Sequence, residues 1–148
     1  MTGFLFAGKD EDYVHSAYAF VVAGGRVYTD IRMGWTVQEA YLNGLRDMSN
    51  HIIQKNLWEH DPAVELVTPS KMIVTLVTTD KLQKLHDNNW KNPDGKPLFH
   101  VPILQELYWH RLYYLERDVI WKAASEVAEN EYFRVEQCRE VIDSLVNS

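Results

Sequence analysis

The stretch Met72-Ile-Val-Thr-Leu-Val-Thr-Thr-Asp80 is rich in β-branched and apolar residues. Both alternating faces of the run are apolar, which predicts a strand covered on both sides, as in the middle of an α/β sheet. The run ends at Asp80, and a helix is predicted from Lys81 to about Trp90. The stretch therefore predicts a central strand that ends at the edge of the sheet where α/β folds bind ligands.

Three further strands are predicted before this stretch. Residues 3–7 form the first, and residues 16–23, rich in β-formers, form the second. Gly24-Gly25 joins the second to a return strand from Arg26 to Met33, because a double glycine between such runs indicates a hairpin.

A helix is predicted directly after this meander. Thr36 and Glu39 match the capping box, in which two side chains satisfy orphan backbone N–H groups at a helix start. Residues 57–71 contain two prolines and are predicted to be a loop with room for one short element. The apolar positions that recur at helical spacing in the first helix are Val37, Tyr41, Leu45, Met48 and Ile52.

The rest of the chain predicts a helix from Val101 to about Glu116, a last strand over residues 118–124 and a final helix over residues 132–146. The element order is β-β-β-α-β-α-α-β-α. Three antiparallel strands followed by strand–helix alternation predict one α/β domain over residues 1–148, with a five-stranded mixed sheet and helices on both faces.

Composition narrows the classes of function. The formal net charge is −6, whereas tight sequence-blind nucleic-acid binders carry a basic excess that neutralises phosphates. The apolar runs are too short to cross a bilayer, and no secretion signal is recognisable at the N-terminus. With a single cysteine, Cys138, no internal disulfide can form, and the sequence predicts a cytoplasmic protein without a membrane segment.

Several motifs, in the same order along the chain, resemble bacterial type 1 ribonuclease H. Trp90-Lys-Asn-Pro-Asp-Gly-Lys-Pro97 resembles the family's Trp-Lys-x-x-Asp-x-Lys-Pro, and Thr79-Asp80 its Thr-Asp corner. Gln38-Glu39-Ala40 is similar to its Met-Glu-Leu, and Cys138-Arg139-Glu140 to its Cys-Asp-Glu. The resemblance implies a ribonuclease H-like fold and a function associated with nucleic acid.

The resemblance also implies a two-metal site. In that family, carboxylates from the first strand, the first helix, the fourth strand and the last helix hold two divalent ions, for which magnesium is suited. Asp80 and Glu39 match two of these positions and are the predicted metal ligands. Each has a local alternative, because Asp80 can be a helix N-cap and Glu39 the partner of Thr36 in the capping box.

The other two positions lack a carboxylate. The first-strand position falls within residues 6–8, none of which can bind a metal, and the last-helix position falls at Arg139. Asp10 and Glu140 are the candidate substitutes, with a solvated hairpin and the exposed face of a helix as their alternatives. One Mg or Mn ion is therefore predicted rather than two.

Trp90, Lys91 and Lys96 are the candidate substrate-binding residues, since an aromatic ring can stack on a base or sugar and lysines can contact phosphates. Trp90 also fits a role as a core anchor for the following helix. Two surfaces are candidates for a protein partner. One is the loop over residues 56–71, interpreted as an insertion, and the other is the aromatic cluster Tyr108, Trp109, Tyr113 and Tyr114.

Two functions follow from these residues. The first is a catalytically degenerate ribonuclease H-like domain that acts as a binding or interaction module, contacting an RNA–DNA hybrid or other nucleic acid weakly. The second is a divergent metal-dependent nuclease that cleaves the RNA of RNA–DNA hybrids. The acidic charge, Arg139 and the missing strand aspartate favour the first, and the sequence leaves catalytic activity open.

Overall fold

The computed structural model describes residues 2–12, 14–22, 24–57, 63–96, 98–115, 118–122 and 132–147. Its strands form one mixed sheet in the order β3-β2-β1-β4-β5. Strand β1 is antiparallel to β2 and parallel to β4, which is in turn parallel to β5. The strands are β1 (Thr2–Lys9), β2 (His15–Val22), β3 (Tyr28–Met33), β4 (Ala63–Val67) and β5 (Asp118–Lys122).

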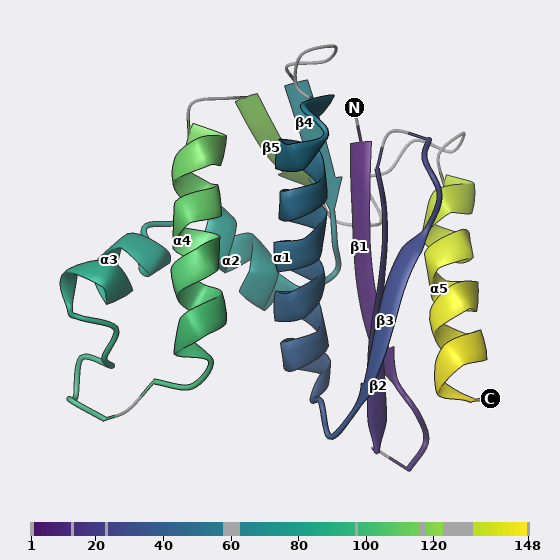
Figure 1. Cartoon of the computed structure of the whole chain (residues 1–148), viewed down its shortest axis with the longest axis horizontal. Coiled ribbons are helices and arrows are strands. Elements are labelled where there is room, and N and C mark those ends of the chain that lie inside the picture. Colours follow the sequence, from purple (N-terminus) through teal and green to yellow (C-terminus); the bar gives the residue numbers. More distant parts are fainter. Residues whose placement is uncertain are drawn as a thin grey trace.

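Helices cover both faces of this sheet, as Figure 1 shows. One face carries α1 (Val37–Gln54), and the opposite face carries α5 (Tyr132–Val146). On the side of α1 lie α2 (Lys71–Thr78), α3 (Lys81–Asp87) and α4 (Val101–Leu115). The molecule is thus a mixed α/β structure. Within the described residues, no helix has both the length and the apolar character needed to cross a membrane.

The sheet separates two hydrophobic cores. Successive strand residues point to opposite faces, so Leu5 packs on the α1 side while Phe4 and Phe6 pack on the α5 side. The α1-side core includes the fully buried Leu45, Met48, Ile52, Leu66, Ile73 and Leu82. The α5-side core includes Val21, Val67, Val135, Cys138 and Ile142.

Cys138 is fully buried in the α5-side core, with no exposed surface. Burial raises the pKa of its thiol to about 12, although the charge of Arg134 acts in the opposite direction. The thiol is therefore protonated at neutral pH.

The predicted strand over residues 72–80 was wrong, because most of this stretch forms α2. Ser70 is the N-cap of this helix, and its side-chain oxygen accepts a hydrogen bond of 3.3 Å from the Ile73 N–H. Ile73 and Leu76, three residues apart, are both buried on the α1 side of the sheet. Strand propensity spans only about 1 kcal/mol, so capping and packing outweigh the preference of the β-branched residues.

The parallel strand next to β1 comes instead from the segment predicted to be a loop. Residues 63–67 form β4, which pairs with β1 on one side and β5 on the other. The prediction of a loop and insertion there was therefore wrong for these residues, while residues 58–62 lie outside the described part of the chain. The predicted capping box of α1 is confirmed, with Thr36 and Glu39 bonding each other's backbone N–H groups at 3.1 and 3.3 Å.

Replacing the α2 cap should lower stability. We expect Ser70→Ala to reduce the free energy of unfolding by about 1 kcal/mol, because the Ile73 N–H loses its acceptor. Urea denaturation measures this change. Ser70→Asp, which keeps an acceptor at the same position, is the control and should stay near wild type. Equal stability of Ser70→Ala and wild type would contradict the capping role.

A buried histidine makes stability depend on pH. His110 in α4 is 8 % exposed, and its Nε2 lies 2.9 Å from the Oδ1 of Asn50 in α1. Burial lowers the pKa of His110, although the charge of Glu106 acts in the opposite direction. The folded state therefore binds fewer protons than the unfolded state as the pH falls through about 6.5, the usual value for histidine.

We expect the stability associated with His110 to be complete above pH ~6.5 and to be lost as the pH falls below it. Urea midpoints measured across this range should fall less steeply in His110→Gln, which can still donate to Asn50. His51, whose pKa is also lowered by burial, accounts for a remaining slope. Identical pH profiles for wild type and His110→Gln would contradict the assignment.

Candidate functional site

A cavity of about 300 Å³ opens where β1, α1, the chain after β4, and α5 meet. These are the four elements from which the resemblance implies metal-binding carboxylates. We call it the four-element cavity. Its lining residues are Phe6, Ala7, Gly8, Tyr41, Pro69, Arg139, Ile142 and Asp143.

The lining of this cavity does not fit a two-metal centre. The facing residues are Ala7 from β1, Tyr41 from α1, Pro69 after β4 and Arg139 from α5, and Asp143 is the one carboxylate among the lining residues. Two divalent ions at close range need several carboxylates to neutralise them. Among the described residues, no group of three or more His, Cys, Asp or Glu side chains is placed to hold a metal ion.

Tyr41 fills the position on α1 that faces β1. The residue is 8 % exposed. Burial raises the pKa of its phenol, while a backbone hydrogen bond from Ala7 and the charge of Arg139 act in the opposite direction. The side chain therefore stays protonated at neutral pH, with its O–H available as a hydrogen-bond donor.

Arg139 brings a positive charge into the same cavity. Its guanidinium carbon lies 5.6 Å from the centroid of the Phe6 ring, within cation–π range. Arg139 takes part in none of the ion pairs found between described residues. Because a guanidinium stays charged at any working pH, this position favours an anion.

Asp80 does not line the four-element cavity. It occupies the N-cap position of α3 without a side-chain capping bond, and its carboxylate lies 3.5 Å from the Lys84 ammonium. Its side chain is 66 % exposed. Figure 1 shows α3 on the outer side of α4, away from the sheet. The placement of Asp80 at the end of a central strand was therefore wrong, because that stretch is helical.

The other predicted carboxylates have structural contacts of their own. Glu39 completes the capping box of α1, which is the alternative noted for it. Asp10 follows β1 and accepts hydrogen bonds from the backbone N–H groups of Val14 at 2.8 Å and His15 at 3.2 Å. Partial burial raises the pKa of Asp10, but these bonds and the His15 ring outweigh it and leave the pKa lowered. Glu140 is exposed on α5 and does not line the cavity.

The predicted substrate-binding residues lie in the connection between α3 and α4 rather than at the cavity. The Trp90 ring packs edge-on against Tyr108, with centroids 5.9 Å apart, and it contacts the α1-side core. Lys91 is exposed, and the Lys96 ammonium lies 4.0 Å from the Asp94 carboxylate. Trp90 therefore has the packing contacts of a core anchor, and a substrate role for the lysines stays a prediction.

Of the aromatic cluster on α4, Trp109 is 63 % exposed, whereas Tyr108 is buried. The side chains of Tyr113 and Tyr114 lie outside the described residues. A protein partner at this helix stays a prediction.

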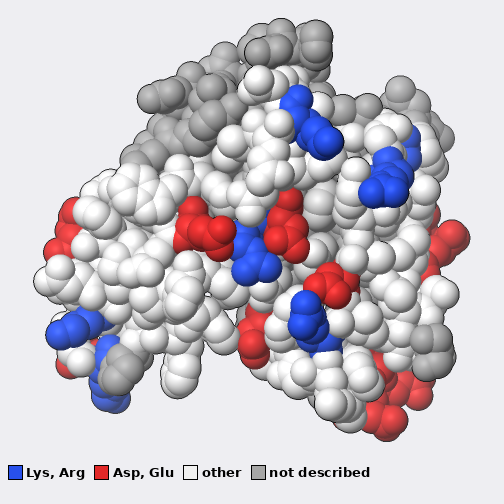
Figure 2. All heavy atoms as spheres, viewed as in Figure 1, with Lys and Arg blue, Asp and Glu red and all other residues white. Residues whose placement is uncertain are grey.

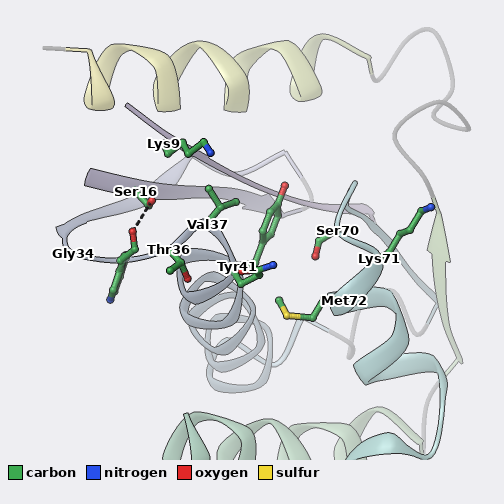
Figure 3. A pocket seen from close by; sticks show the side chains of 11 residues that line it. Lys9, Ser16, Gly34, Thr36, Val37, Tyr41, Ser70, Lys71 and Met72 are labelled. Carbon is green, nitrogen blue, oxygen red and sulfur yellow. Dashed lines mark hydrogen bonds between the residues drawn. The ribbon is translucent and has the colours of Figure 1, made fainter. Parts of the chain in front are cut away.

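A second, larger cavity of about 620 Å³ lies beside the first turns of α1 and α2 (Figure 3). Thr36, Val37 and Gln38 begin α1, Ser70 and Lys71 begin α2, and Lys9 ends β1. Lys9 and Lys71 bring positive charge to its lining, and the first turn of α2 carries no acidic residue, whereas Glu39 caps the first turn of α1. We call it the lysine cavity; it shares Tyr41 with the four-element cavity.

Four residues that line the cavities are not predicted as site residues by sequence patterns: Tyr41, Pro69, Lys9 and Lys71. Tyr41 sits among apolar helical positions and was interpreted as core, which it also is. One sequence signal could have identified Pro69. Thr68-Pro69 directly follows β4, and in the family that the chain resembles the Thr-Asp corner follows the fourth strand in the same way. On the face seen in Figure 2, basic and acidic side chains are interspersed.

No protein-family model and no curated protein matches the sequence. Among solved structures, a foamy viral protease-reverse transcriptase in complex with double-stranded DNA aligns with a TM-score of 0.70 at 16 % identity, covering 95 % of this chain and 90 % of that chain. The solution structure of the prototype foamy virus (PFV) RNase H domain aligns with a TM-score of 0.62 at 12 % identity, covering 97 % and 90 %.

A third structure, the native protease-reverse transcriptase of prototype foamy virus, aligns with a TM-score of 0.67 at 11 % identity. The alignment covers 99 % of this chain and 21 % of that one. The chain has a ribonuclease H-like fold, as the resemblance in its motifs implied. At these identities the likeness concerns the fold alone.

Proposed function

We propose that this chain is a ribonuclease H-like domain that binds nucleic acid and does not hydrolyse it. The observation that carries the proposal is the lining of the four-element cavity, to which the four elements contribute Ala7, Tyr41, Pro69 and Arg139. A two-metal mechanism needs carboxylates to hold the ions that assist the attacking and leaving oxygens. Asp143 alone supplies too little negative charge for two ions.

Binding to nucleic acid is supported by the lysine cavity next to this site. Lys9, Lys71 and the first turns of α1 and α2 surround a space that favours phosphate. The structural relatives include a protease-reverse transcriptase in complex with an RNA/DNA hybrid, matched over 82 % of this chain at 17 % identity. The net charge of −6 leads us to expect weak binding that falls steeply with salt.

We expect the wild-type protein to leave a labelled RNA–DNA hybrid intact in both Mg²⁺ and Mn²⁺, with an active ribonuclease H as the assay control. Gel analysis of the hybrid measures the outcome. Asp143→Asn removes the carboxylate of the cavity and is the matched variant. Cleavage by wild type that disappears in Asp143→Asn would contradict the proposal and favour a divergent metal-dependent nuclease.

Binding is tested by fluorescence anisotropy of the same hybrid at low salt. Lys71→Ala should weaken binding, because it removes a positive charge from the lysine cavity. Lys84→Ala makes the same charge change on α3, where Lys84 pairs with Asp80, and should bind like wild type. Equal effects of the two substitutions would show that only overall charge matters.

A further inference from the structure

The four-element cavity combines a cation with a neutral hydrogen-bond donor. Arg139 contacts the Phe6 ring by a cation–π contact, which uses none of its five N–H donors. Burial raises the pKa of the Tyr41 phenol, so its O–H stays protonated at neutral pH and can donate to a ligand. Both groups line the same space of about 300 Å³.

A close approach of α5 to β1 places Arg139 at this cavity. A Cβ atom added at Gly8 would lie 2.8 Å from the Ile142 Cγ2, too close for a side chain without a shift of the Ile142 side chain or of α5. Gly8 and Ile142 both line the cavity together with Arg139, which lies one turn earlier on α5. The glycine therefore allows the helix to bring a guanidinium to the strand.

We propose that Arg139 and Tyr41 bind a backbone phosphate of the nucleic acid directly, so that a guanidinium replaces metal ions at this cavity. This inference rests on the proposed function and specifies how its site is used. An arginine presents N–H donors in a fork that matches phosphate oxygens. The one carboxylate of the lining, Asp143, repels a phosphate and so limits the affinity that Arg139 can supply.

The lysine cavity extends this site. Because Tyr41 lines both cavities, a phosphate at Arg139 and another near Lys71 would lie on either side of one side chain. A nucleic-acid backbone can therefore occupy both cavities as it passes Tyr41. Binding of this kind needs no divalent ion.

The test measures affinity for a labelled RNA–DNA hybrid in EDTA and in Mg²⁺ at matched ionic strength. Wild type should bind equally in both. Arg139→Ala should weaken binding about tenfold, the effect of one lost charge-assisted contact, and reduce the salt slope by about 1. Arg139→Lys should recover part of the affinity, and Tyr41→Phe, which keeps the ring, should weaken binding to a smaller degree.

Arg134→Ala is the matched control, since it removes the same charge from the same helix. Arg134 donates to the Gln137 side chain and the Gly25 carbonyl and does not line the cavity, so affinity should change less than about twofold. Thermal melts verify that each variant is folded. Arg139 is exposed, so Arg139→Ala should melt near wild type.

The outcomes separate the two proposals. Wild-type binding that requires Mg²⁺, or unchanged affinity in both Arg139→Ala and Tyr41→Phe, would overturn the arginine site while nucleic-acid binding stands. Failure of wild type to bind hybrid, duplex or single strands at low salt would overturn the proposed function as well.

Discussion

A variant carrying Ala7→Asp, Tyr41→Glu, Pro69→Asp and Arg139→Asp is expected to bind Mn²⁺, whereas the wild-type protein is not. These residues all line the four-element cavity, so the substitutions place four carboxylates where β1, α1, the chain after β4 and α5 meet. Without metal, the like charges should destabilise the fold. Bound Mn²⁺ should restore it, by about 2.7 kcal/mol at a hundred times the dissociation constant.

Melting temperature as a function of Mn²⁺ concentration measures this coupling. The matched control carries Ala7→Asn, Tyr41→Gln, Pro69→Asn and Arg139→Asn, which have similar shapes without charge, and its melting temperature should not respond to Mn²⁺. Isothermal titration calorimetry then gives the number of ions bound. A carboxylate variant that is folded yet indifferent to Mn²⁺ would show that the four positions do not converge on one site.

Gly44→Val should destabilise the protein by about 2–3 kcal/mol, a large effect for a domain of this size. Gly44 lies in α1 against the sheet. A Cβ atom there would come within 2.7 Å of the Leu5 Cδ1 and 2.9 Å of the Tyr18 Cγ. Glycine inside a helix normally costs about 1 kcal/mol relative to alanine, and the closeness of α1 to β1 and β2 explains why it is present.

Chemical denaturation measures the loss, and Gln54→Val is the control. Gln54 is the last residue of α1 and is exposed, so the same β-branched side chain there tests helix propensity without a clash. Its midpoint should change little. If both variants lost similar stability, helix propensity rather than overpacking would explain the effect of Gly44→Val.

Much of the fold could be predicted from local signals. The capping box at Thr36, the apolar spacing of α1 and the span of α5 all agree with the structure. The hairpin at Gly24-Gly25 also agrees, since β2 and β3 pair antiparallel on either side of it. These features are set by contacts within a short segment, which a sequence displays directly.

Local signals could not predict that residues 63–67 form the strand β4 and that residues 71–78 form the helix α2. Residues 63–67 are a short run, and they become a sheet strand because β1 and β5 hydrogen-bond to both of their edges. Residues 71–78 have stronger strand propensity but are capped by Ser70 and packed through Ile73 and Leu76. Pairing across the sheet and packing against other helices are non-local, so propensity gives the wrong answer for both segments.

Because the central strand was predicted at residues 72–80, the metal site was predicted at the end of the wrong segment. With residues 72–80 as the central strand, Asp80 became a metal ligand, although the chain after the true strand presents Pro69. The first strand and the last helix were predicted close to their observed positions, and Ala7 and Arg139 of these elements line the cavity. Tyr41 was missed because a buried tyrosine at helical spacing has the same pattern whether or not its hydroxyl faces a cavity.

Because Cys138 is buried, the reactivity of its thiol can be used to measure local opening of the structure. The protein has one thiol, which lies on the face of α5 that packs against the sheet and reacts only as a thiolate. A thiol reagent can therefore modify it only after α5 leaves the sheet. The rate of thiol labelling under native conditions therefore measures how often α5 detaches from the sheet. A ligand that bridges α5 and β1 would lower this labelling rate.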